Sequence, residues 1–66
     1  MVKPDEIEFI KRVRATERIP SSEWDSLTKK QYYWLDKWTD KGFWEYGVSL
    51  RSGWLTAEGK NEFSKY

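Results

Sequence analysis

The sequence TKKQYYWLDKWTDKGFWEYGVSLRSGWLT, residues 28–56, carries the strongest structural signals of this 66-residue chain. It contains four of the five tryptophans and three of the four glycines. Large rings bury much apolar surface per residue, and glycines allow the backbone to turn. We therefore expect the core and the main changes of chain direction to lie within this stretch.

The stretch begins with a capped helix. Thr28 and Gln31 form a T-x-x-Q capping box, and apolar residues at helical spacing follow it. At 100° per residue, Leu35 and Trp38 fall on one face, so we expect them to anchor the core. Gly42 supplies a left-handed stop. The opposite face should be exposed, and it carries lysines, one tyrosine and two acids: Lys29, Lys30, Tyr33, Asp36, Lys37, Asp40 and Lys41.

After the glycine the apolar pattern changes from helical to alternating. The alternation from Phe43 to Leu50 predicts a half-buried strand. A turn over Leu50–Gly53, with Arg51 at its exposed tip, leads to the return strand Trp54–Leu55 of an antiparallel hairpin. One face of the first strand should hold Trp44, Tyr46 and Val48.

A helix is expected ahead of this stretch, from Pro4 to about Glu17. Proline fits the first turn of a helix, and Asp5 and Glu6 follow it at the positive end of the helix dipole. Ile19-Pro20 ends the helix, because the residue before proline avoids the α region.

A short helix over about Ser22 to Leu27 should come next. Its cap is either Ser21 or Ser22, and Trp24 and Leu27 lie three residues apart, so both should be buried.

At the other end of the chain, Thr56 caps a last helix from Ala57 to about Lys65. Phe63 is its one large inward-facing apolar residue, and Gly59 should weaken it by up to about 1 kcal/mol relative to alanine.

The amino-acid composition excludes several classes of function. The chain has no cysteine and no histidine, which removes disulfides, the thiol nucleophile, the usual general base and most transition-metal sites. We therefore expect no catalytic residues, no metal, no cofactor and no small-molecule substrate, and hence no enzyme. No apolar run approaches the roughly 20 residues of a membrane span, and acids near the N-terminus are unlike a signal peptide, so we expect a cytoplasmic protein without membrane contact.

Net charge and aromatic content allow two interpretations. With a net charge of +1, attraction to nucleic acid requires local segregation of charge. Aromatic residues make up 12 of the 66 residues. Either all of them fill the small core, or some are not needed there and form a contact surface.

The order of motifs from Thr28 to Phe63 resembles the winged helix-turn-helix domain of bacterial repressors of the MarR and PadR kinds. In that family the recognition helix ends in a pattern like L-x-x-L-x-x-x-G followed by two hydrophobic residues, matched here by Leu35, Trp38 and Gly42-Phe43-Trp44. The wing returns through a segment matched by GWLTAEG, residues 53–59. The match covers about half of the chain, and the bulky Trp24 departs from the family's usual second helix.

The resemblance implies one small α+β, mainly α winged-helix domain over residues 1–66 that binds duplex DNA. The helix that begins at Thr28 would enter the major groove, with Lys37 near the backbone, and Arg51 would reach a minor groove or a phosphate. Nearest the bases and phosphates would be Lys29, Lys30 and Tyr33. Such a protein acts in transcriptional regulation or as an accessory factor of a phage or mobile element, as a monomer or weak homodimer.

A protein-interaction module, an inhibitor or adaptor on the same frame, is the alternative. It would bind its partner through Tyr33, Tyr46 and Tyr66, and the near-neutral charge and the two acids Asp36 and Asp40 favour it. A third possibility is a homodimer that pairs the edge of the hairpin with a copy of itself.

Overall fold

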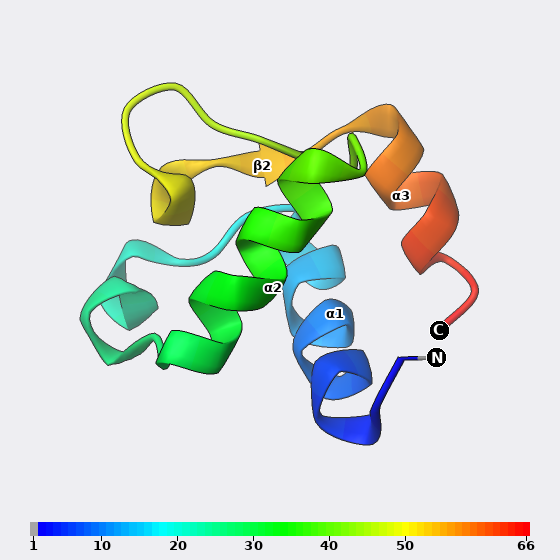
Figure 1. The fold of residues 1–66 in the computed structure, drawn as a ribbon, viewed down its shortest axis with the longest axis horizontal. Coiled ribbons are helices and arrows are strands. Elements are labelled where there is room, and N and C mark those ends of the chain that lie inside the picture. The colour runs from blue at the N-terminus through cyan, green and yellow to red at the C-terminus, as the bar shows by residue number, and fades with distance from the viewer. Residues whose placement is uncertain (1) are drawn as a thin grey trace.

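The computed structural model describes residues 2–66 and places helix α2 at the centre of the fold, in contact with α1, β1 and η2 (Figure 1). The molecule is a small, mainly helical protein with a two-stranded antiparallel hairpin before a C-terminal helix, which confirms that part of the prediction. In chain order the elements are α1 (Pro4–Thr16), the 3-10 helix η1 (Ser21–Ser26), α2 (Lys29–Asp40), β1 (Trp44–Glu45), the 3-10 helix η2 (Leu50–Ser52), β2 (Trp54–Leu55) and α3 (Ala57–Phe63).

Helix α2 is bounded as its sequence predicts. The Thr28 hydroxyl accepts a hydrogen bond of 3.1 Å from the Gln31 amide, and the Gln31 side chain accepts one of 2.9 Å from the Thr28 amide. The helix gives way to Gly42 with φ at +82°, a left-handed conformation that glycine adopts without strain. Leu35 and Trp38 are 0% and 1% exposed, so both predicted core anchors are confirmed.

Trp38 joins four elements in one aromatic cluster. Its ring stacks on Phe9 of α1, with centroids 5.5 Å apart, and meets the edge of Phe63 of α3 at 4.8 Å. Trp44 of β1 lies 6.2 Å away on another side. Tilted and edge-on ring pairs contribute roughly 0.5–1.5 kcal/mol beyond the area they bury. The core of this small chain is therefore built largely from rings.

The end of α1 is fixed to the hairpin. Glu17 follows the helix in the left-handed conformation, with φ at 64°, and its carbonyl accepts a hydrogen bond of 2.9 Å from the Leu55 amide of β2. Arg14 donates to the carbonyl of Phe63 at 3.0 Å, which places a cation at the negative end of α3. Helix α1 therefore holds both the hairpin and the C-terminal helix.

Gly59 allows α3 to lie directly against the chain that leads into β1. Thr56 caps the helix by accepting from the Gly59 amide at 3.0 Å, as predicted. A Cβ atom at Gly59 would lie only 2.2 Å from the carbonyl oxygen of Phe43. The sequence suggests only a glycine that weakens the helix, whereas the fold requires glycine at this position because of the close approach.

The predicted strand from Phe43 to Leu50 is wrong in its length. Only Trp44 and Glu45 pair with the return strand, Trp44 opposite Leu55 and Glu45 opposite Trp54. The Trp44 indole is buried and donates to the Leu50 carbonyl at 2.8 Å, so the chain curls around this ring instead of extending. Val48, expected to share a face with Trp44, is 97% exposed, whereas Trp44 is buried.

The short helix before α2 also differs from its prediction. It is a 3-10 helix that begins at Ser21, after Pro20, and neither Ser21 nor Ser22 caps it through a side chain. Trp24, predicted to be buried, is half-buried, and its indole donates to the Ile19 carbonyl at 2.9 Å.

Candidate nucleic-acid interface

The first turn of α2 has a charge pattern unlike the other two α-helices. Helix α1 carries Asp5 and Glu6 in its first turn, and α3 carries Glu58 there. Helix α2 has no acid there and begins with Lys29 and Lys30. The N-terminus of a helix carries a partial positive charge from its free amide groups, so acids stabilise it and lysines do not. This end of α2 is therefore suited to meet an anion.

Lys29 and Tyr33 lie on the outermost ridge of α2. They are four residues apart, both are exposed, and 64% of the Tyr33 surface is accessible. Within residues 2–66, no carboxylate forms an ion pair with Lys29. The structure therefore leaves these two predicted contact residues open to a partner.

Lys30 is turned toward α1. Its Nζ lies 2.8 Å from Asp5 Oδ2 and 6.0 Å from the centre of the Trp34 ring. The hydrogen bond from Lys30 lowers the pKa of Asp5. Both side chains of this pair are more than half exposed, so water screens the attraction between them.

Lys37 neutralises a carboxylate in the core. Its Nζ lies 2.9 Å from Oε1 of Glu6, whose side chain is only 6% exposed, while the Trp38 indole donates to the other oxygen at 3.0 Å. A buried carboxylate without a cation is costly. Lys37, predicted near the DNA backbone, therefore has a structural partner. The one signal in the sequence is the position of Glu6, four and seven residues before Ile10 and Val13 on the apolar face of α1.

Arg51 does not lie at the tip of the hairpin, and this prediction is wrong. Its guanidinium carbon lies 5.6 Å from the centre of the Trp24 ring, and its Nη1 lies 3.6 Å from Asp25 Oδ1. The displacement follows from η2, which forms where a tight turn is predicted and contacts η1. The tip of the hairpin is the segment around Val48 instead.

The charge of the outer ridge of α2 reverses along the helix. Lys29, Tyr33, Asp36 and Asp40 are spaced by four, three and four residues, so they form one line on the helix, and all four are exposed. The N-terminal half of this ridge is basic and the C-terminal half is acidic. Any contact with phosphates is therefore confined to the N-terminal half.

Three apolar residues of the hairpin and its connection are exposed, and we call this set the hairpin patch: Tyr46, Val48 and Trp54. Their exposed fractions are 47%, 97% and 37%. Trp54 faces outward with Glu45, its partner in the two-stranded ladder, while Trp44 and Leu55 face the core. Sequence reasoning did not identify Val48 and Trp54 as exposed residues, because Val48 lay in the alternating pattern of a half-buried strand and Trp54 in its return strand. Tyr66, proposed for a protein contact, is half-buried against the core.

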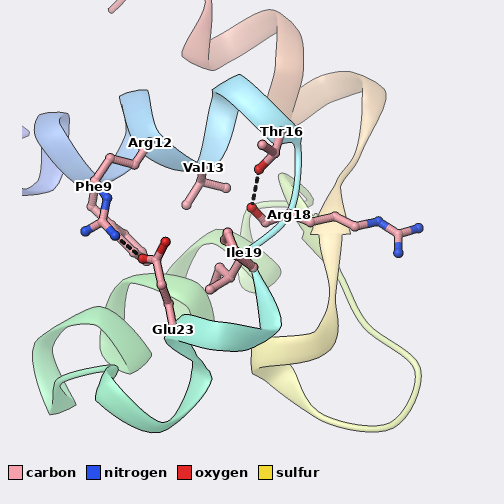
Figure 2. A pocket seen from close by; sticks show the side chains of 8 residues that line it. Phe9, Arg12, Val13, Thr16, Arg18, Ile19 and Glu23 are labelled. Atoms are coloured by element: carbon pink, nitrogen blue, oxygen red, sulfur yellow. Dashed lines mark hydrogen bonds and ion pairs between the residues drawn. The ribbon is translucent and has the colours of Figure 1, made fainter.

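A cavity of about 250 Å³ lies between α1 and η1, and Figure 2 shows the side chains that line it. Phe9, Val13 and Ile19 form its apolar part, and an ion pair between Arg12 and Glu23 crosses its mouth. Arg18 also lines the cavity, but its guanidinium extends away from Phe9 and Glu23 (Figure 2). None of the five predicted contact residues lines this cavity, although Phe9 and Arg12 also line the neighbouring groove that contains Lys30.

Over the part of the chain that the structure describes, no group of three or more acidic, cysteine or histidine residues is placed to hold a metal ion. Among the same residues, no helix is long and apolar enough to cross a membrane.

Comparisons of the chain with protein-family models, with curated proteins and with solved structures found no match.

Proposed function

We propose that the protein binds duplex DNA with the N-terminal half of α2, as a small winged-helix protein whose wing is the β1–β2 hairpin. The observation that supports this best is the pair Lys29 and Lys30 in the first turn of a well-capped helix. The order of a capped helix, a hairpin and a short helix is also the order that suggested the winged-helix resemblance.

Lys29 is unfavourable for the isolated protein, whereas Lys30 is partly compensated by its ion pair with Asp5. A charge of the wrong sign at a helix terminus costs about 0.3–1 kcal/mol at an exposed site. A phosphate at this position would reverse the effect, since the ammonium groups and the free amides of the helix would all attract it. Residues that reduce stability in the free state and favour an anion are typical of a binding site.

Three cations and one ring make up the proposed contact set: Lys29, Lys30, Arg51 and Tyr33. Arg51 is retained because stacking on Trp24 orders its guanidinium, and a guanidinium has several donors to spare for a phosphate. Lys37 is omitted because drawing it to DNA would leave the buried Glu6 without its cation.

Binding should be weak and steeply dependent on salt. Three neutralised phosphates give a slope of log K against log salt concentration of about −3. Asp36 and Asp40 lie on the same ridge and would repel a backbone that extended along α2. We propose a role in transcriptional regulation or as an accessory factor of a phage or mobile element, in which such a domain acts beside other DNA-bound proteins.

The test is titration of a fluorescently labelled duplex at low and moderate salt with wild type, Lys30→Ala and Tyr33→Ala. Both variants should bind several-fold more weakly. Lys60→Ala is the matched control, because Lys60 pairs with Glu17 at 3.0 Å with similar exposure but lies on α3. No binding at low salt, or an equal loss in the control, would contradict the proposal.

The hairpin patch supports a second candidate, binding to another protein. Val48 is almost fully exposed and lies in the same irregular connection as Tyr46, and Trp54 of β2 is also exposed. An aspartate in place of Val48 should abolish such binding, including self-association through the hairpin, and leave binding of DNA by α2 unchanged. Sedimentation equilibrium over a range of concentrations would reveal a homodimer that the variant lacks.

A further inference from the structure

We infer that Asp5 and Asp25 act as internal competitors of DNA phosphate, because each holds a cation of the proposed interface in the free protein. Asp5 pairs with Lys30, and Asp25 pairs with Arg51. The inference rests on the proposed DNA binding and concerns what limits its strength.

The hydrogen bond from Lys30 to Asp5 has the same geometry as one from a lysine to a phosphate oxygen. Its N–O distance of 2.8 Å is that of a charge-assisted hydrogen bond from an ammonium group to any anionic oxygen. The ammonium group is directed at Asp5, so a phosphate oxygen must displace the carboxylate or share the ammonium group with it. Both side chains are more than half exposed, and the exchange therefore takes place in water without uncovering buried groups.

The backbone of α1 holds Asp5 in place. One carboxylate oxygen accepts from the Glu6 amide at 3.1 Å, and the other accepts from Lys30. The hydrogen bond from Lys30 lowers the pKa of Asp5, so the carboxylate is charged throughout the neutral range. Asp5 is thus an ordered anion at the edge of the interface.

The pair formed by Asp25 and Arg51 is looser. The two atoms are 3.6 Å apart and the Asp25 side chain is fully exposed, whereas Arg51 is held by the Trp24 ring. A phosphate could displace Asp25 without moving the guanidinium. Asp25 is therefore the weaker competitor of the two.

Competition of this kind favours a ligand that offers several phosphates at once. Each exchange replaces a carboxylate with a phosphate and alone contributes little binding free energy. Because the phosphates of a duplex are linked, every exchange after the first is intramolecular. The protein would then discriminate against single phosphates and release DNA readily.

The experiment compares the affinity of wild type, Asp5→Asn and Glu8→Gln for one labelled duplex at low and moderate salt. Glu8 is a matched control, since it is an exposed acid of α1 that lines the same groove as Asp5 and Lys30, and within residues 2–66 it forms no ion pair. Each variant removes one negative charge from α1, but only Asp5→Asn frees Lys30.

Asp5→Asn should bind about two- to fivefold more tightly than wild type, the range expected for releasing an exposed ion pair. The affinity of Glu8→Gln for the duplex should rise less. Adding Asp25→Asn to Asp5→Asn should raise the affinity by a further, smaller factor. All of these increases in affinity should shrink as the salt concentration rises. Thermal unfolding of each variant confirms that α1 stays folded.

Equal affinities of Asp5→Asn and Glu8→Gln would overturn the inference while leaving the proposed function in place. Absence of duplex binding by wild type and by every variant would overturn both.

Discussion

Glu6 lies in the core between α1 and α2, where its Oε2 accepts a hydrogen bond of 3.0 Å from the indole of Trp38. Its other oxygen is bound by Lys37 at 2.9 Å. The two bonds complete the hydrogen bonding of a carboxylate that would otherwise be a buried, unpaired charge. One side chain of α1 thereby holds two side chains of α2.

Lys37→Ala should lower the free energy of unfolding by about 1–3 kcal/mol, because it leaves the Glu6 carboxylate buried without its cation. Urea denaturation measures this change. The double variant with Glu6→Gln should lose less than the sum of the single variants, since a glutamine can still accept from Trp38 without burying a charge. If Lys37→Ala is as stable as wild type but binds DNA less tightly, Lys37 is a phosphate contact after all.

Trp38→Ala should cost roughly 3–5 kcal/mol, which is enough to unfold a domain of this size. Its ring contacts rings from three other elements and is 1% exposed. The matched variant is Trp54→Ala, which removes a ring that is 37% exposed and should change stability far less. Circular dichroism during heating compares the two, and similar losses would contradict the assignment of their faces.

Gly59→Ala should destabilise the protein by about 1–3 kcal/mol, although alanine is the better helix former. The added methyl group would meet the Phe43 carbonyl oxygen at 2.2 Å. Gly47 provides the control, because a Cβ there meets nothing within 4 Å and its φ lies outside the left-handed range. Gly47→Ala should be neutral or stabilise by up to about 1 kcal/mol. Greater stability of Gly59→Ala would show that α3 lies further from Phe43.

The carboxyl group of Asp5 should titrate below its ordinary pKa of 3.8, because Lys30 binds the charged form. Since folding lowers this pKa, the stabilisation that Asp5 contributes is complete at neutral pH and is lost as pH falls through the acidic range. Nuclear magnetic resonance titration of the side-chain carbon measures the midpoint. In Lys30→Ala the midpoint should move up, and an unchanged midpoint would mean that the ion pair does not persist in solution.

Local signals in the sequence were sufficient to predict the helix caps and the residues at which the helices end. Thr28, Gln31 and Gly42 act within one or two helical turns of themselves, and the wheel placed Leu35 and Trp38 correctly because one face of α2 is apolar. The exposure of Lys29 and Tyr33 followed from the same wheel.

The ion pairs depend on residues far apart in the chain, and the path of the hairpin depends on a side-chain contact that the alternation of apolar residues does not report. Lys37 meets Glu6 across 31 positions, and Lys30 meets Asp5 across 25. The strand ends early because the Trp44 indole donates to the carbonyl of Leu50, and alternation alone does not reveal such a contact. Arg51 meets Trp24 because η2 contacts η1, and these two elements are likewise far apart in the chain.

The aromatic cluster around Trp38 has a consequence for protein dissection. A synthetic peptide of residues 28–56 would contain the capped helix and both strands but would lack Phe9 and Phe63, which cover two sides of the Trp38 ring. It would also lack Glu17, whose carbonyl binds the Leu55 amide. Such a fragment would remain largely unstructured in water, so binding assays with an excised helix or hairpin would report on a disordered peptide and not on the surface that the whole chain assembles.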